Sequence, residues 1–313
     1  MTAAVLEAVP NFSEGRNLGV VDESVGAIRG AGATVLDWSA DPDHNRSVVT
    51  FVGPPDTVEA AAIAGARIAV ERIDLRAHKG VHPRIGALDV LPFVPLTGLT
   101  ISDARAVARR AGDRLADELG VPVFFYADAS EPPGRALAEL RRGGFEQLVD
   151  GWPADRRPDL LPAGWTHAGA HPTAGASCVG ARPVLLAWNV LVRGIDAEEA
   201  ERLVRSLREA GGERVVRALA LPLTGRAALQ ISMNLERVED GAPMDVFRRI
   251  ETAVAEAGGT IVETEVIGLL PDRLVADAAA DRLRIRGETR QRMLSRRLAA
   301  YLAERECGAG VHE

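Results

Sequence analysis

The order of strand-like and helix-like segments occurs twice along this chain, and that repetition most constrains its fold. In each half, apolar periodicity predicts a strand, a helix, two strands, a second helix and a last strand. The predicted elements of the first half are residues 4–9, 18–29, 34–38, 47–52, 57–71 and 88–94. Those of the second half are residues 184–192, 197–210, 214–219, 229–235, 244–257 and 260–266. The fold class is therefore α/β, of the α+β kind: two ferredoxin-like βαββαβ halves whose largely antiparallel sheets are covered by helices, with a ligand cleft between them.

The first half carries an extension before the second half begins. Its predicted elements are a helix at residues 102–119, a strand at 121–126 and a helix near 135–142. The following segment, residues 150–182, is rich in Gly, Pro, Trp and His and has no clear periodicity. A segment of this length is usually a functional loop or a linker, and its aromatic residues favour a loop that covers a ligand. The predicted domains are residues 1–181 and 182–305.

Composition limits the class of partner. The 313 residues are 47% hydrophobic and carry a net charge of −7, which fits a globular protein and argues against general nucleic-acid binding. The N-terminus lacks a basic start followed by an apolar stretch, and no window is long and apolar enough to span a membrane, so we expect a cytoplasmic protein. Cys178 and Cys307 have no CxxC partner, so neither a disulfide framework nor a zinc knuckle is predicted.

The stretch RAHKGVHPRIGALDV, residues 76–90, is the densest group of chemically active side chains. His78 and His82 have the spacing of a metal pair on a helix, but Gly80 and Pro83 interrupt a helix there, so no metal site is predicted. Pro83 biases His82 towards an extended backbone. An imidazole held in this way suits proton transfer near neutral pH, and the alternative is a histidine that only positions a loop.

Three other motifs have both a structural and a functional interpretation. Residues 41–46, DPDHNR, are typical of a turn, yet His44 and Arg46 exceed what a turn needs and could face a substrate carboxylate. In residues 10–15, PNFSEG, Ser13 could cap the next helix, while the amide of Asn11 suits a polar ligand. Residues 175–180 have the glycine spacing of a phosphate loop but lack its Lys and Ser/Thr, so these glycines more simply allow close approach of a flat ligand or another strand.

Taken together, five segments resemble the glutamate formimidoyltransferase (formiminotransferase) family. They are residues 9–17, 36–55, 73–96, 175–190 and 229–236. The resemblance covers nearly the whole chain, through both subdomains of the transferase, without a cyclodeaminase domain. It implies transfer of a formimidoyl group from N-formimidoyl-L-glutamate to tetrahydrofolate as co-substrate, with release of L-glutamate, in histidine degradation. It further implies small-molecule substrates and a homodimer.

The resemblance also suggests site residues. It makes His82 the catalytic acid/base. Arg84 would bind a glutamate carboxylate, and Asp89 would orient the imidazole or accept from an amine. The candidate substrate-binding residues are Asn11, Asp41, His44, Asn45, Arg46, Arg84 and Asp89. The candidate folate-binding residues are Leu161, Pro162, Ala163, Gly164, His171, Thr173, Ala174 and Gly175.

Departures from the family pattern keep alternatives open. Some members have a carboxylate where this chain has Ser39, so either Asp41 or Asp43 replaces it or the supporting acid is missing. Ser39 and a lengthened loop at residues 158–175 leave open a folate-binding scaffold without catalysis. A further alternative is formyl transfer between 5-formyltetrahydrofolate and glutamate, which the same cleft and base would serve.

Overall fold

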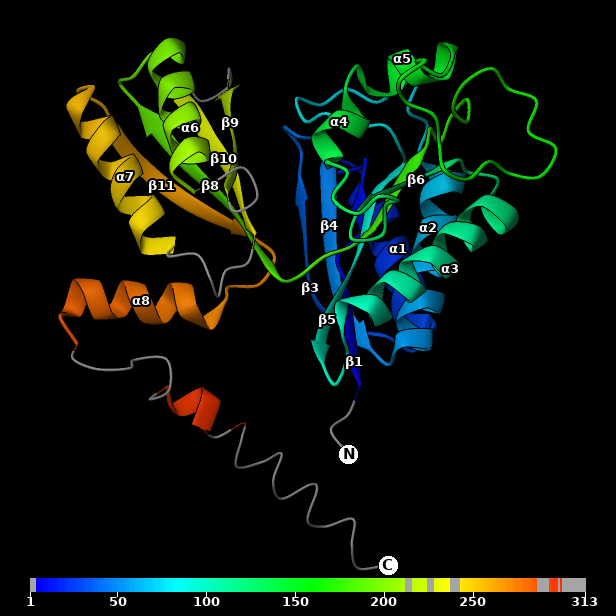
Figure 1. The fold of residues 1–313 in the computed structure, drawn as a ribbon, viewed down its shortest axis with the longest axis horizontal. Coiled ribbons are helices and arrows are strands. Elements are labelled where there is room, and N and C mark those ends of the chain that lie inside the picture. Colours follow the sequence, from blue (N-terminus) through cyan, green and yellow to red (C-terminus); the bar gives the residue numbers. More distant parts are fainter. Residues whose placement is uncertain are drawn as a thin grey trace, which may run out of the picture. The chain divides into compact units, whose positions relative to one another are not determined.

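The computed structural model describes residues 4–211, 216–223, 228–236, 243–285, 293–297 and 299. The chain divides into two compact units, here called unit 1, which ends at Val184, and unit 2, which begins at Leu185 (Figure 1). None of the described helices combines the length and the apolar character that crossing a membrane requires.

Unit 1 is built on a mixed sheet. Its strands are β1 (Val5–Ala8), β2 (Asn11–Phe12), β3 (Thr34–Asp41), β4 (Arg46–Gly53), β5 (Leu88–Thr97), β6 (Val123–Ala127) and β7 (Ser177–Ala181). β1 and β2 both pair antiparallel with β4 on one side and β5 on the other, and β3 pairs with β4. β1 and β2 are thus one strand interrupted at Val9 and Pro10, and β3, β4, this strand and β5 have the order of a ferredoxin-like sheet.

The helices of unit 1 lie on both faces of its sheet. They are α1 (Leu18–Gly30), α2 (Pro55–Arg72), α3 (Ile101–Leu119), α4 (Leu137–Arg141) and α5 (Gly144–Asp150). α1, α2 and α3 pack side by side over one face (Figure 1). Alternate residues of β6 serve the two faces, since Phe125 joins the core beneath these helices while Phe124 packs with Leu140 of α4 and Leu148 of α5.

β7 was not predicted, and the expectation of an irregular loop at its residues is wrong. The strand is inserted parallel between β5 and β6 and is buried along its whole length. A segment of small residues buried on both faces shows no alternation of apolar and polar positions, which explains the miss. The predicted close approach is confirmed at Gly180, where a Cβ would collide with the ring of Tyr126 on β6. Cys178 lies in the same strand, and burial raises the pKa of its thiol.

Unit 2 has the simpler sheet. Its elements are β8 (Leu185–Arg193), α6 (Ala197–Gly211), β9 (Val216–Leu223), β10 (Ala228–Glu236), α7 (Pro243–Glu256), β11 (Thr260–Ile267) and α8 (Asp272–Leu283). The strands run in the order β11, β8, β10, β9, and each pair is antiparallel, as in a ferredoxin-like fold. α6 and α7 cover one face, against which Leu186, Trp188 and Val190 of β8 pack (Figure 1).

The predicted fold class is confirmed, since the chain forms two sheet-bearing halves covered by helices. The start of the strand predicted at 214–219 and the predicted domain end at residue 305 lie outside the described residues. α5 and α8 were not predicted. α5 is short and begins at a pair of glycines with positive φ, Gly143 and Gly144, which resemble a loop in sequence.

Candidate active site

A small pocket in unit 1 gathers side chains from the β3–β4 turn and the start of β4, from the segment between α2 and β5 and the start of β5, and from the residue after β2. It is lined by Ser13, His44, Asn45, Arg46, His78, His82, Arg84 and Asp89. The structure thus brings together six of the predicted residues: His44, Asn45, Arg46, His82, Arg84 and Asp89. Asn11 and Asp41 do not line this pocket, although Asp41 contacts His44.

Asn45 fixes the shape of the β3–β4 turn. Its φ of 48° lies in the left-handed region, which asparagine tolerates better than most residues. Its side-chain Oδ1 accepts the backbone N–H of Gly15 at 3.0 Å, and its Nδ2 donates to the carbonyl of Lys79 at 3.2 Å. The segment 73–87 can approach this turn because residue 80 is glycine, where a Cβ would collide with the carbonyl of His44. Asn45 therefore joins three segments that are distant in sequence.

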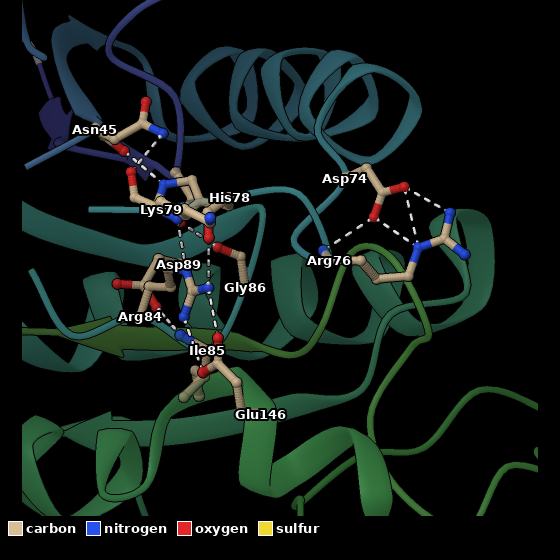
Figure 2. Close-up of polar contacts among 11 residues, drawn as sticks. Asn45, Asp74, Arg76, His78, Lys79, Arg84, Ile85, Gly86, Asp89 and Glu146 are labelled. Carbon is tan, nitrogen blue, oxygen red and sulfur yellow. Dashed lines mark hydrogen bonds and ion pairs between the residues drawn. The ribbon is translucent and has the colours of Figure 1, made fainter. Parts of the chain in front are cut away.

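His78 is the second tie between the β3–β4 turn and segment 73–87. Its Nε2 lies 2.8 Å from the carbonyl oxygen of Asn45, and its Nδ1 accepts from Nε of Arg84 at 2.7 Å. Figure 2 shows this chain continuing from Arg84 to Glu146 of α5, whose two carboxylate oxygens accept from the guanidinium at 3.1 and 2.8 Å. Burial lowers the pKa of His78, so its imidazole is neutral at pH 7 and donates to Asn45 through Nε2. Both nitrogens of His78 and most donors of Arg84 are used within the protein.

Asp89 is held in the same way at the start of β5. Its side chain is almost fully buried, accepts the backbone N–H of Ile85 at 2.8 Å and forms an ion pair with Arg141 of α4. The carboxylate therefore anchors the chain that follows His82.

His82 projects into the pocket beside a buried arginine. Nη1 of Arg46 lies 3.0 Å from Nε2 of His82, and because a guanidinium can only donate, Nε2 is the acceptor. Burial first, and then the positive charges of Arg46 and Arg141, lower the pKa of His82 well below its usual value. The imidazole is neutral at pH 7, carries its proton on Nδ1 and presents a lone pair on Nε2.

One N–H donor of Arg46 has no partner among the described residues. Burial and the charge of Arg141 lower its pKa to about 9, while Asp89 and Asp41 oppose that shift, so it remains a cation at pH 7. Its Nε is buried and has no hydrogen-bond partner among the described residues. A buried charged donor without a partner is costly, which points to a ligand anion as its partner.

The predicted folate-binding residues lie apart from the pocket lining. Nδ1 of His171 accepts the backbone N–H groups of Ala174 at 3.0 Å and Thr173 at 3.3 Å, which closes a turn. The carbonyls of Thr173 and Ala174 accept from Leu75 and Ala87, so this turn packs directly against the ends of segment 73–87. Leu161 is 47% exposed, and the carbonyl of Pro162 accepts the N–H of Trp165.

Four residues that help to build the site were not among the candidate site residues. Arg141 and Glu146 pair with Asp89 and Arg84 across more than fifty residues and belong to no local motif. Ser13 does not cap α1, whose N-cap is Asn17; its hydroxyl instead donates to the carbonyl of Gly86 at 2.7 Å. His78 belongs to the segment already singled out, but its structural role depends on Asn45. Within the described ranges, no group of three or more His, Cys, Asp or Glu is arranged to hold a metal ion.

Residues 5–182 match the family model described as the formiminotransferase domain, N-terminal subdomain, which places the chain in the formiminotransferase class. The chain is 36% identical to the glutamate formimidoyltransferase of Streptococcus pyogenes serotype M1, over 88% of this chain and 92% of that protein. It is also 36% identical to the enzyme of the same name from Thermoplasma acidophilum, over 94% and 97%. The rat formimidoyltransferase-cyclodeaminase is 37% identical over 88% of this chain and 52% of its own length. The chain belongs to the glutamate formimidoyltransferase family.

Proposed function

We propose that this chain is a glutamate formimidoyltransferase, which moves the formimidoyl group of N-formimidoyl-L-glutamate to tetrahydrofolate in histidine degradation. The products are 5-formimidoyltetrahydrofolate and L-glutamate. The observation that carries the proposal is the neutral His82 imidazole in a pocket with a buried arginine, in a chain that belongs to this family. Tetrahydrofolate is the co-substrate, and no metal takes part.

His82 is the proposed catalytic acid/base. The attacking folate nitrogen adds to the formimidoyl carbon and must lose a proton, while the departing glutamate nitrogen must gain one. The low pKa of His82 keeps it unprotonated at pH 7, ready to accept a proton, and makes its imidazolium a strong acid that gives the proton up again.

Arg46 is the proposed partner of a donor carboxylate. Arg84 was predicted for such a role, but its guanidinium is paired with Glu146 and His78, whereas Nε of Arg46 has no partner among the described residues. A carboxylate on Arg46 would draw it away from Nε2 of His82, which frees the lone pair for catalysis. The other proposed substrate contacts are Asn11, Asp41, His44, Asn45, Arg84 and Asp89. Four of them, His44, Asn45, Arg84 and Asp89, line the pocket with Arg46.

Two variants test the role of Arg46. Arg46→Ala is expected to raise the KM for N-formimidoyl-L-glutamate by about 10²-fold, which corresponds to loss of a charge-assisted hydrogen bond worth roughly 2–3 kcal/mol. The matched variant Arg72→Ala removes an arginine from the exposed end of α2 and should leave KM unchanged. An unchanged KM for Arg46→Ala would contradict this assignment.

The loop containing Leu161–Gly164 and His171–Gly175 is the proposed cover for the folate. Its support is the direct packing of residues 173 and 174 against segment 73–87, which carries His82. By family resemblance we also propose a cytoplasmic homodimer. The ligand cleft between the two halves and the domain limits at 181 and 182 remain predictions.

A turnover assay tests the proposed reaction. The purified chain is incubated with N-formimidoyl-L-glutamate and tetrahydrofolate, and 5-formimidoyltetrahydrofolate and free glutamate are followed by mass spectrometry. Equal appearance of the two products supports the proposal. A parallel incubation contains 5-formyltetrahydrofolate and glutamate, and turnover there alone would favour formyl transfer. Binding of tetrahydrofolate without turnover in either incubation would favour the scaffold.

A further inference from the structure

His44 is another imidazole in the pocket, and one of its ring nitrogens has no hydrogen-bond partner among the described residues. Its side chain is buried, and its Nε2 makes no hydrogen bond within the described residues. Its ring centre lies 5.8 Å from that of His82, with the two planes tilted by 41°. Of the three histidines that line the pocket, His44 and His82 are therefore neighbours, and His44 has an unused nitrogen.

Asp41 orients this second ring. One carboxylate oxygen accepts the backbone N–H groups of Asp43 at 2.8 Å and His44 at 2.9 Å, so the carboxylate is fixed by the turn itself. The other oxygen lies 3.6 Å from Nδ1 of His44. A carboxylate on that side favours the tautomer with the proton on Nδ1, which leaves a lone pair on Nε2.

The charges around the two rings differ in sign. His82 faces the guanidinium of Arg46, with Arg141 nearby, so a proton placed on its ring is held weakly. His44 faces the carboxylate of Asp41, whose charge is opposite to that of Arg46.

We propose that His44, oriented by Asp41, is a second proton-transfer residue of this site and works together with His82. This inference rests on the proposed formimidoyl transfer. As the bond from the folate nitrogen to the formimidoyl carbon forms, that nitrogen loses its proton to His82, which passes it through a bridging water molecule to Nε2 of His44. As the bond from the carbon to the glutamate nitrogen breaks, its electron pair stays on that nitrogen, which takes the proton from His44. Both rings return to their neutral forms.

Substitution of His44 separates proton transfer from substrate binding. The side-chain amide of His44→Gln can still form a hydrogen bond near the position of Nε2 but cannot carry a proton. Its kcat should fall by about 10²-fold, the lower end of the usual range for an acid/base residue, with KM for the donor within about threefold of the wild type. Exogenous imidazole should restore part of the kcat of His44→Ala. Wild-type kcat in His44→Gln, or a raised KM with unchanged kcat, would overturn the proposal.

The role of Asp41 is tested with its neighbour as control. Asp41→Asn keeps an oxygen for the turn but places an amide beside Nδ1 of His44, so kcat should fall about tenfold while KM is unchanged. Asp43→Asn removes the same charge from the same turn and should retain wild-type kcat. Equal effects of the two substitutions would show a general effect of charge and would overturn the assignment of Asp41 as a positioning residue.

A spectroscopic measurement keeps the inference testable apart from turnover. Nitrogen-15 correlation spectra of the folded wild type should show His44 with its proton on Nδ1, and the same spectra confirm that each variant is folded. Observation of the Nε2–H tautomer would overturn the proposal even if the enzyme is active. If the wild type shows no formimidoyl transfer, the proposed function fails and the inference fails with it, whereas an active wild type with fully active His44→Gln rejects the inference alone.

Discussion

Units 1 and 2 share a βαββαβ frame but differ at one equivalent connection. In both units the second helix leads to the last strand of this frame. In unit 2 residues 257–259 are enough to join α7 to β11, whereas in unit 1 residues 73–87 lie between α2 and β5. The longer connection carries His78, His82 and Arg84. The frame by itself forms a core, and the added connection supplies the candidate chemistry.

The first strand shows the same contrast. β8 runs unbroken and pairs with β10 over eight residues. In unit 1 the corresponding strand is interrupted at Val9 and Pro10, and proline has no N–H to donate to a sheet. After the interruption, Ser13 reaches the carbonyl of Gly86 beside the pocket. In unit 1, regular strand pairing is thus interrupted close to the candidate site.

The largest expected effect comes from the catalytic imidazole. His82→Ala should lower kcat by about 10²–10⁴-fold, because proton transfer to and from the two nitrogens loses its acid/base. The control Arg282→Ala lies on α8 of unit 2, where the arginine is exposed and pairs with Glu251. It should leave turnover unchanged in a steady-state assay. Comparable turnover of His82→Ala and wild type would show that the long connection does not carry the chemistry.

A methyl group at Gly80 should disturb the site through the backbone. Gly80→Ala pushes segment 73–87 away from the carbonyl of His44, so kcat/KM should fall at least about tenfold, as expected for displaced catalytic groups. Gly26→Ala is the matched control, because nothing lies near a Cβ there and the residue is inside α1. It should keep full activity and raise the free energy of unfolding by about 0.5–1 kcal/mol. Full activity of Gly80→Ala would mean that the β3–β4 turn and segment 73–87 need not be in contact.

A substitution in the short connection of unit 2 should change the stability of the protein and leave its turnover unchanged. A Cβ at Gly259 would press on Ile195 and on the carbonyl of Arg193. Gly259→Ala should therefore lower the free energy of unfolding by about 1–3 kcal/mol, the usual cost of overpacking, as measured by urea denaturation. Below the unfolding transition, kcat should match the wild type. A loss of kcat in the folded variant would break the division of roles between the units.

Acidification should lower the stability of unit 1 before that of unit 2. This is the smallest of the expected effects. Burial is the main cause that lowers the pKa values of His78, His82 and His171 in the folded protein. Below an unfolded pKa of about 6.5 the unfolded state binds more protons, so stability is complete above that pH and falls as the pH drops towards the folded values.

Amide hydrogen exchange at two pH values measures this difference between the units. After Val184 the sequence contains only one histidine, His312, so the described residues of unit 2 include no histidine. Protection of β4 and β5 should decrease more than protection of β8 and β10 when the pH falls from about 7 to about 5.5. An equal loss in both units would show that carboxylates, and not these histidines, dominate the acid response.

The sequence predicted the elements that have strong periodicity and missed those that lack it. β4, β8, α3 and α6 lie where apolar patterns placed them. β7 was missed because Gly, Ala, Ser and Cys fit a loop as well as a doubly buried strand, and only its neighbours β5 and β6 decide between the two. β2 is too short to produce a pattern.

For the candidate site, two sequence blocks predicted six pocket residues, because turn residues and ionisable side chains occur together there. The pairing of those residues was not predictable. In the sequence, Arg84 has no evident partner, but in the structure it pairs with Glu146 of α5. In the same way, Asp89 pairs with Arg141 of α4. Such partners depend on the packing of helices that have no motif of their own.

Cys178 offers a practical consequence of the buried parallel strand. Thiol reagents attack an accessible thiolate, and β7 provides neither access nor an easily ionised thiol. Alkylation of Cys178 requires β7 to separate from β5 and β6. The rate of labelling would therefore measure how often the sheet opens behind the pocket.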